Sequence, residues 1–153
     1  MLSFRKATET DILLYFEWAN DVTVRQNSIN KSKIKFEDHI RWFTNKIADP
    51  NSIMLVFLEV DIEIGQLRIE IDNHNKEAII NYTIDKKFRG RGLGTQILSE
   101  SYKYFMNLQL DIPLIGLVKP ENKPSVAALQ RAGFMQHNLP VIINNEHYLK
   151  FIK

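Results

Sequence analysis

The fold is decided by the stretch Phe88-Arg89-Gly90-Arg91-Gly92-Leu93-Gly94-Thr95. Its three glycines stand at alternate positions and leave backbone N–H groups uncovered by side chains. The apolar run 79–84 before it predicts a strand, and residues 96–107 after it have helical spacing. A turn that ends at a helix N-terminus offers unpaired donors and a partial positive charge, which suits a phosphate or pyrophosphate.

Length and composition predict one soluble globular domain over residues 1–153. The net charge of +2 does not indicate a nucleic-acid surface. The absence of cysteine excludes disulfides, thiolate metal sites and a cysteine nucleophile, and it fits the cytoplasm. No run is long and apolar enough to cross a membrane, and the start Met1-Leu2-Ser3-Phe4-Arg5 reads as the beginning of a fold rather than a signal peptide. We therefore expect a cytoplasmic protein with no metal, nucleic-acid or membrane partner.

The N-terminal half predicts a strand, two helices and a connecting loop. Residues 2–6 alternate as a half-buried strand does, and the first helix has the face Ile12, Tyr15, Phe16 and Ala19. Residues 22–35 have mixed polarity, which indicates a loop or a short helical turn. The second helix has Phe36, Ile40, Phe43 and Ile47 on one face and His39, Trp42 and Lys46 on a neighbouring face.

The remaining segments predict a meander, two helices and a closing hairpin. Strands are expected at residues 53–59, 64–71, 78–84 and 112–118. A helix opens at Pro124 and ends at Ala132, and the residues 134–143 and 146–152 form the hairpin, with Asn144-Asn145 at its turn. The order of elements indicates an α+β (α/β) fold with a mixed sheet.

Three interpretations of the glycine turn compete with one another. A dinucleotide fold requires a different glycine spacing, and a phosphate-binding P-loop requires Gly-Lys-Ser/Thr, which is missing. A sharp turn without any ligand remains possible, but such a turn needs one glycine rather than three. What is left is a strand, an Arg-Gly-x-Gly-x-Gly turn and a helix.

This turn resembles the acetyl-CoA motif Gln/Arg-x-x-Gly-x-Gly/Ala of the GNAT N-acetyltransferase superfamily. The matching residues are Arg89-Gly90-Arg91-Gly92-Leu93-Gly94, and Asn122 followed by Gly133-Phe134 fits the downstream pattern of the same family. The resemblance extends over nearly the whole chain and includes the element order. It implies a GNAT-like fold with a central mixed, mostly antiparallel seven-stranded sheet and about four flanking helices.

The resemblance also implies where acetyl-CoA, the co-substrate, binds. Its pantetheine arm would pair with the backbone of Tyr82, Thr83 and Ile84, and a backbone N–H near Tyr82 would polarise the acetyl carbonyl. The pyrophosphate would be held by the turn, which comprises Arg89, Gly90, Arg91, Gly92, Leu93, Gly94 and Thr95. Asn122 and Ser125 would complete the site, although Asn122 also fits a plain helix cap.

The catalytic groups are less clearly marked. Glu70 is the best carboxylate for a general base, whereas the alternative is a solvated side chain paired with Arg68 or Lys150. Asn81, Tyr82 and Thr83 could order a water relay. Many family members place a tyrosine as thiolate acid where this chain has Leu129, so Tyr148 or Tyr82 would substitute, or water would serve. Either tyrosine could instead be a core residue.

The acceptor side resembles the GNAT branch that acetylates nucleotide-linked aminosugars in bacterial surface glycan pathways, such as pseudaminic acid synthesis. The resemblance rests on residues 17–28, 39–43, 48–51 and 64–70. Arg25 could bind a diphosphate, and His39, Trp42 and Arg68 could contact the acceptor. The alternatives are a loop ion pair for Arg25, a satisfied histidine for His39, and core packing for Trp42 and Trp18.

The sequence therefore predicts an N-acetyltransferase that moves acetyl from acetyl-CoA to a primary amine by direct attack in a ternary complex. The predicted partner is a small-molecule amine, a nucleotide sugar in particular, and the chain would act as a monomer or homodimer. Two alternatives stay open. One is a protein N-terminal acetyltransferase of the ribosomal-protein type, and the other is a non-catalytic acyl-CoA-binding module.

Overall fold

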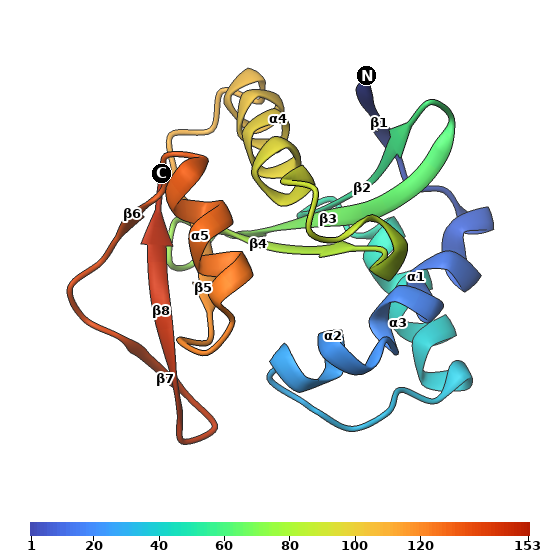
Figure 1. Ribbon diagram of the computed structural model, residues 1–153, viewed down its shortest axis with the longest axis horizontal. Helices are drawn as coiled ribbons and strands as arrows, with labels where there is room; N and C mark the ends of the chain where they lie inside the picture. Colours follow the sequence, from blue (N-terminus) through green and yellow to red (C-terminus); the bar gives the residue numbers. More distant parts are fainter. The chain divides into compact units, whose positions relative to one another are not determined.

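The computed structural model describes residues 1–153 and contains two compact units (Figure 1). The first unit comprises Met1–Glu70 and Asn81–Arg89, and the second comprises Ile71–Ile80 and Gly90–Lys153. Strands β3 (Ile62–Asp72) and β4 (Glu77–Ile84) each contribute residues to both units. The prediction of one domain stays a prediction.

The first unit combines antiparallel strands with three α-helices. Strand β1 pairs with β2, and β2 pairs with β3 in the register Met54↔Arg68 and Val56↔Gln66. Its further elements are β1 (Leu2–Lys6), the 3-10 helix η1 (Glu9–Asp11), α1 (Ile12–Ala19), α2 (Val22–Asn27), α3 (Phe36–Ala48), β2 (Ser52–Glu59) and the 3-10 helix η2 (Lys86–Phe88). The segment expected as a loop or a helical turn therefore contains the short helix α2.

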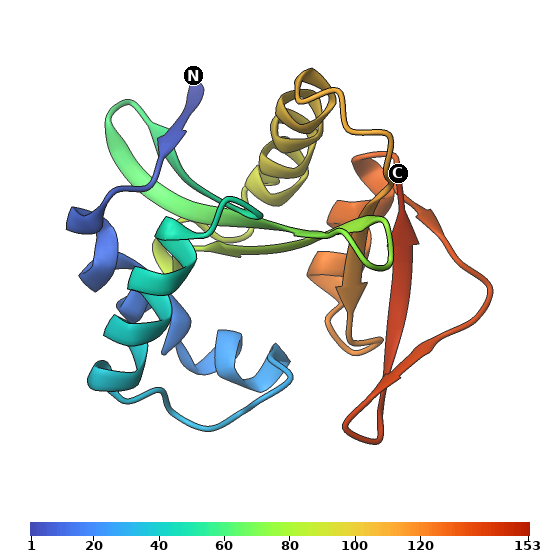
Figure 2. The ribbon, with the colours of Figure 1, turned by 180° about the vertical axis from the view of Figure 1, so that it is seen from behind.

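Helices α1 and α3 cover one face of strand β2. Their contact is a buried cluster of Tyr15, Trp18, Phe43, Met54 and Val56, and Figure 2 shows the two helices beside each other against the strands. Because alternate residues of a strand share a face, the register places Gln66, Arg68 and Glu70 on the same face as Met54 and Val56. The polar row of β3 therefore lies under these helices.

The buried face of α3 differs from the predicted one. His39 and Phe43 are the buried residues, whereas Phe36 and Ile40 are exposed to 37% and 38%. Phe43 belongs to both arrangements, so the helix is rotated about its axis relative to the prediction. The cause is the aromatic contact with α1, since the Phe43 ring packs edge-on against Tyr15 with centroids 5.3 Å apart.

The second unit contains a mixed sheet and two helices. The first half of β4 pairs in parallel with β5 (Leu114–Val118), which pairs antiparallel with β8 (Glu146–Ile152). Strands β6 (Met135–Gln136) and β7 (Val141–Ile143) pair antiparallel with the two ends of β8. The helices are α4 (Leu93–Asn107) and α5 (Lys123–Arg131).

The closing hairpin is confirmed at its turn and corrected along its first strand. Asn144 and Asn145 have φ values of 50° and 61°, as a two-residue hairpin turn requires. The strand expected over 134–143 is split into β6 and β7. Pro140 lies in the interruption, and proline cannot donate to a strand ladder.

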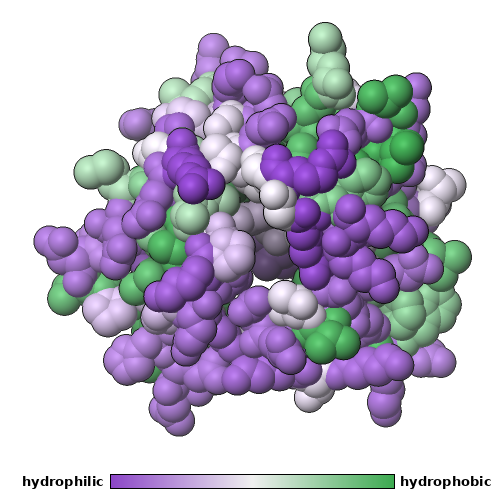
Figure 3. All heavy atoms as spheres, in the orientation of Figure 1, coloured by the Kyte–Doolittle hydropathy of each residue, from purple (hydrophilic) through white to green (hydrophobic).

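The predicted fold class is confirmed, because the strands form a mixed, mostly antiparallel arrangement with helices packed on it. The strands number eight rather than seven because of the split hairpin strand, and the α-helices number five because of α2. The face drawn in Figure 3 is mainly hydrophilic, and its hydrophobic residues lie in separate small groups. No helix combines the length and apolar character needed to cross a membrane.

Gly65→Ala tests the close approach of β3 to β4. A Cβ at Gly65 would lie 2.4 Å from the backbone oxygen of Thr83, which cannot swing away as a side chain does. We expect the substitution to lower the free energy of unfolding by about 1–3 kcal/mol, measured by urea denaturation. Gly116→Ala is the control, because its Cβ would meet only the side chain of Leu129, at 2.8 Å. Equal losses in the two variants would contradict this account.

Candidate active site

The glycine turn leads into an uncapped helix N-terminus. Gly90 and Gly92 have φ values of 78° and 75°, which only glycine adopts without strain, and a Cβ at either would meet no atom within 4 Å. Gly92 is the N-cap residue of α4, and no side chain caps the helix. The first backbone N–H groups of α4 therefore lack the usual side-chain acceptor. Gly94 is buried in the first turn of the helix.

Strand β4 continues beyond its ladder with β5. That ladder joins Ala78–Ile80 to Leu114–Gly116, whereas β4 runs on to Ile84. Within this extension Asn81 is exposed, Thr83 is buried and Tyr82 is partly exposed. The predicted pantetheine segment thus lies outside the β5 ladder.

Gln66 connects the polar side chains of β3 and β4. Its Nε2 donates to Asn81 Oδ1 at 3.4 Å and to Thr83 Oγ1 at 3.3 Å. The residue is 6% exposed, and its buried Oε1 has no hydrogen-bond partner in the chain. Sequence reasoning assigned no role of its own to Gln66.

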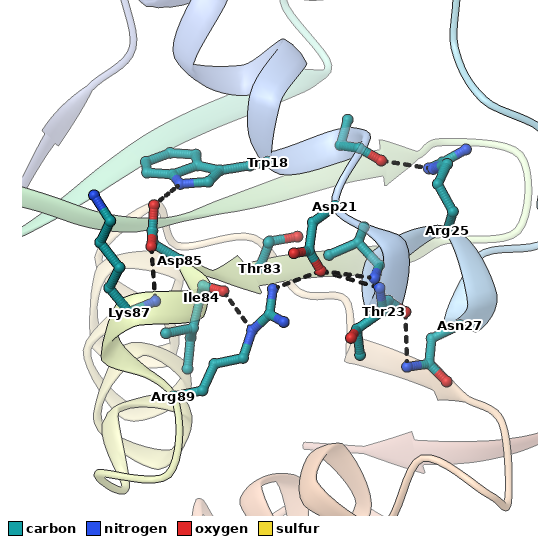
Figure 4. A network of polar contacts seen from close by, with 12 residues as sticks. Trp18, Asp21, Thr23, Arg25, Asn27, Thr83, Ile84, Asp85, Lys87 and Arg89 are labelled. Carbon is teal, nitrogen blue, oxygen red and sulfur yellow. Dashed lines mark hydrogen bonds and ion pairs between the residues drawn. The ribbon is translucent and has the colours of Figure 1, made fainter.

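The segment from Asp85 to Arg89 is held by side chains of α1 and of the α2 N-terminus (Figure 4). Trp18 Nε1 donates to Asp85 Oδ2 at 3.0 Å. The Arg89 guanidinium donates to the Ile84 carbonyl and to Asp21 Oδ1, both at 2.9 Å. The Nε and Nη2 groups of the predicted cofactor residue Arg89 are therefore already used within the protein.

Glu70 is not suited to the role of general base predicted for it. Its Oε1 forms ion pairs with Arg68 Nε at 2.7 Å and Lys46 Nζ at 3.0 Å. Burial raises the pKa of this carboxyl, but the two cations outweigh it and hold the pKa below its ordinary value. A carboxylate stabilised in this way has a low affinity for a proton. The predicted partner Lys150 instead pairs with Glu77, at 3.0 Å.

His39 is a core residue rather than an acceptor contact. It is 1% exposed, and its Nε2 lies 2.8 Å from the Ile12 carbonyl of α1. Phe16 and Phe43 pack against its ring. Burial lowers the pKa of His39 more than the bond to Ile12 raises it, so the ring is neutral at neutral pH. The prediction that it binds the substrate is corrected.

Arg25 supports the loop that follows α2. Its guanidinium donates to the Ala19 carbonyl at 2.6 Å, the Asn30 carbonyl at 2.9 Å and the Ser28 hydroxyl at 3.0 Å. These contacts occupy the face with which an arginine would bind a diphosphate. Burial lowers the pKa of Arg25. Neutral acceptors thus take the place of the loop ion pair considered for Arg25. Its contact with a diphosphate stays a prediction, which these bonds do not support.

Trp42 and Arg68, two further predicted acceptor residues, lie together. The Arg68 guanidinium carbon is 4.9 Å from the centroid of the Trp42 ring, and Arg68 also pairs with Glu70. Trp42 is partly buried against the α1–α3 cluster. One face of this ring is thus covered by a cation, which limits it as a stacking platform.

In the second unit, Asn122 is the N-cap of α5, and its side chain accepts from the Ser125 N–H at 3.4 Å. The capping alternative considered for Asn122 is therefore present. Leu129 is buried, and its side chain would meet a Cβ placed at Gly116. It packs as an apolar residue where many family members carry a tyrosine.

Tyr148, a predicted acid, is buried in the second unit beside a charged pair. Its hydroxyl donates to Glu146 Oε2 at 3.4 Å, and Lys119 Nζ lies 2.9 Å from the same oxygen. Lys119 itself is only 7% exposed. Sequence reasoning did not identify Lys119, because no local pattern indicates its pairing with Glu146.

No group of three or more histidine or carboxylate side chains is arranged to hold a metal ion.

Of the polar residues that sequence reasoning left without a role, Asp21 had the clearest signal. An aspartate directly before a helix is a typical N-cap, and Asp21 accepts from the N–H groups of Thr23 and Val24. Its second contact, with Arg89, joins residues far apart in the sequence and has no local signal.

Comparison with known proteins gives a consistent result. Residues 1–135 match the family model of the acetyltransferase (GNAT) domain. The chain is 25% identical over 111 residues to YwnH of Bacillus subtilis (strain 168), a protein that bears the name of a phosphinothricin acetyltransferase. This match covers 67% of the chain and 64% of YwnH, which is less than two thirds of that relative's length.

Two solved structures share the fold over nearly their whole length. The aminoglycoside acetyltransferase AAC(6')-Ib in complex with coenzyme A has a TM-score of 0.86 at 14% identity, and the match covers 100% of this chain and 94% of that one. Spermidine N-acetyltransferase from Vibrio cholerae, in complex with CoA and spermine, has a TM-score of 0.84 at 19% identity, with coverages of 99% and 93%. At these identities the likeness establishes the fold.

His39→Gln tests the core assignment through pH. Below about pH 6.5 the unfolded chain binds a proton that buried His39 does not, so the native protein loses stability as the pH falls from that value toward the lowered pKa. We expect the free energy of unfolding to fall more between about pH 7.5 and about pH 5.5 in the wild type than in the variant. The difference is at most about 1.4 kcal/mol per pH unit.

The exposed His74 provides the matched control for this measurement. The change in pH dependence should be larger in His39→Gln than in His74→Gln. If His39→Gln kept the pH dependence of the wild type but raised the KM for the acceptor, the core assignment would be wrong and His39 would be a substrate-binding residue.

Proposed function

The chain belongs to the acetyltransferase family defined by the GNAT domain, and we propose that it transfers an acetyl group from acetyl-CoA to the primary amine of a small molecule. The attack is direct, within a ternary complex. The observation that carries this proposal is the uncapped N-terminus of α4 behind two glycines in the left-handed conformation. These backbone N–H groups are available for the pyrophosphate of the donor.

We assign the donor site by family resemblance to two segments. The turn from Arg89 to Thr95 holds the pyrophosphate through backbone N–H groups, while Nε and Nη2 of Arg89 donate to Ile84 and Asp21. The residues Tyr82–Ile84 hold the pantetheine arm, and their position beyond the β5 ladder supports this assignment. Asn122 and Ser125 remain proposed cofactor contacts at the start of α5.

The transfer needs a neutral amine close to a polarised thioester carbonyl. We propose that the amine is oriented by a polar group in which Gln66 donates hydrogen bonds to both Asn81 and Thr83. The attacking nitrogen forms a bond to the acetyl carbon, loses a proton to solvent water, and displaces the CoA thiolate. Glu70 is left out as base because two cations lower its proton affinity.

The departing thiolate must be protonated or stabilised. Tyr82 and Tyr148 are the proposed donors, as the sequence predicts, because Leu129 supplies no proton. A phenol has an ordinary pKa near 10 and therefore carries its proton at neutral pH. Tyr148 has an additional acceptor in Glu146, which Lys119 neutralises in turn.

We take the acceptor to be the amino group of a nucleotide-linked aminosugar. The contacts of Arg25 and His39 remove two of the residues expected to bind it. The loop between α2 and α3 provides the remaining support, because Lys31, Lys33 and Lys35 are exposed there at alternate positions. Ammonium groups spaced in this way favour an anionic acceptor, such as a nucleotide diphosphate, over a cationic polyamine.

A thiol-release assay with acetyl-CoA tests the acceptor. We expect turnover with UDP-linked 4-amino sugars and weaker turnover with an aminoglycoside, spermidine or a ribosomal-protein N-terminal peptide. A preference for the peptide would replace the proposed acceptor with a protein N-terminus. Tight CoA binding without release from any amine would favour the non-catalytic alternative.

Charge reversal in the loop sharpens this test. Lys33→Glu combined with Lys35→Glu should raise the KM for the nucleotide sugar about tenfold and leave the KM for acetyl-CoA unchanged. Lys76→Glu combined with Lys103→Glu reverses the same number of exposed charges outside the loop and is the control. Equal effects of both variants would argue against an acceptor site at this loop.

Gly92→Glu tests the donor site. The side chain and its negative charge would occupy the turn, so we expect the KM for acetyl-CoA to rise at least about tenfold. Gly133→Glu adds the same charge and the same backbone strain at the end of α5, where φ is 85°, and should leave this KM near the wild-type value. An unchanged KM in Gly92→Glu would refute the assignment of the donor site.

A further inference from the structure

The residues just before the glycine turn carry contacts that neither catalysis nor acceptor binding explains. Asp85 closes β4 and caps the short helix η2 by accepting from the Lys87 N–H at 2.9 Å. The backbone N–H of Phe88 returns to the Asp85 carbonyl, also at 2.9 Å. Arg89 then precedes Gly90 directly, so its position sets where the turn begins.

Two side-chain contacts fasten this segment to α1 and to the start of α2 (Figure 4). Trp18 holds Asp85 at one end of the segment, and Asp21 holds Arg89 at the other. Trp18 is 4% exposed and belongs to the α1–α3 core, which makes the first contact rigid. The segment is therefore fixed at one end by α1 and at the other by the N-cap of α2.

The Arg89 guanidinium is held from two sides. Nε donates to the Ile84 carbonyl at the end of β4, and Nη2 donates to Asp21. Because the guanidinium is planar, two donors in fixed directions define its orientation. The next residues, Gly90 to Gly92, have no side-chain packing at the two glycines that could orient them independently. On the strand side, the start of the turn therefore depends on Arg89.

One carboxylate oxygen of Asp21 accepts hydrogen bonds both from Arg89 and from the N-terminus of α2. Its Oδ1 accepts from Arg89 Nη2 and from the N–H groups of Thr23 and Val24 at the start of α2. Burial raises the pKa of this carboxyl, but the bond from Arg89 and the two backbone bonds outweigh it and keep the pKa below its ordinary value. Asp21 is thus ionised at neutral pH, and α2 and Arg89 are joined through one charged group.

We propose that Asp21 is a positioning residue for the acetyl-CoA turn, and that the Asp21–Arg89 ion pair links the conformation of α2 to the affinity for acetyl-CoA. The inference rests on the proposed donor site. Asp21 itself does not contact the cofactor in this account. It fixes Arg89, and Arg89 fixes the first peptide of the turn, whose N–H groups bind the pyrophosphate.

Asp21→Asn isolates the ion pair from the helix cap. Asparagine caps helices about as well as aspartate, so the bonds to Thr23 and Val24 can persist while the charge opposite Arg89 is lost. We expect the Kd for CoA, measured by titration calorimetry, to rise about fivefold. The KM for acetyl-CoA should rise equally, and kcat should stay within about twofold of the wild type.

Arg89→Lys and Asp38→Asn complete the design. Lysine keeps the charge but cannot donate to Ile84 and Asp21 in the two fixed directions, so it should weaken CoA binding as Asp21→Asn does. The double variant should then lose no more affinity for CoA than either single variant, because both substitutions remove the same contact between Asp21 and Arg89. Asp38→Asn removes an exposed aspartate–arginine pair with Arg41 on α3 and should leave the Kd unchanged.

The outcomes separate this inference from the proposed function. Absence of CoA binding by the wild type would overturn both. Normal binding by the wild type and by Asp21→Asn would overturn the positioning role alone. A lower melting temperature in Asp21→Asn with an unchanged Kd would also overturn it, because the ion pair would then contribute to stability only. Equal weakening in Asp38→Asn would attribute the effect to general charge.

Discussion

The start of α4 is the constraint on which the proposed chemistry depends. A helix begins with four backbone N–H groups that its own carbonyls cannot reach, and most helices satisfy some of them with a side chain. Here the N-cap is Gly92, which has no side chain to offer. Glycine is required at this position by its positive φ, so the conformation that forms the turn also leaves the donors open. An anionic ligand is the natural partner for such an end.

Most of the fold could be predicted from the sequence because periodicity records burial. The alternation of residues 2–6 predicted β1, and the turn residues Asn144-Asn145 predicted the closing hairpin. The glycine turn predicted the strand before it and the helix after it, β4 and α4. The predictions failed where a tertiary contact outweighed the local pattern. Helix α3 turns His39 inward in place of Ile40, because a histidine that bonds the Ile12 carbonyl can be buried while neutral.

The candidate site was less predictable for the same reason. Residue type identified Arg25 and Glu70 as groups able to bind an anion or accept a proton, but their partners lie on other segments. Arg25 donates to backbone carbonyls of the loop after α2, and Glu70 is paired with Lys46 of α3. A sequence shows which chemistry a side chain can perform, whereas the fold determines whether that chemistry is already used internally. The glycine turn differs from these residues, because the anion binding proposed for it uses backbone N–H groups rather than a side chain.

The same distinction explains why the ion pair of Asp21 and Arg89 matters for the donor site. A binding site made of backbone N–H groups cannot be adjusted by rotamers, so its geometry is set by the residues that hold the chain on either side. On the helical side, α4 fixes the turn through its own hydrogen bonds and through buried Leu93 and Gly94. On the strand side, Arg89 is the last residue with a side chain before Gly90, and its anchor is the N-cap of α2. At the proposed donor site, the affinity for acetyl-CoA is therefore tied to α2, the helix that precedes Lys31, Lys33 and Lys35.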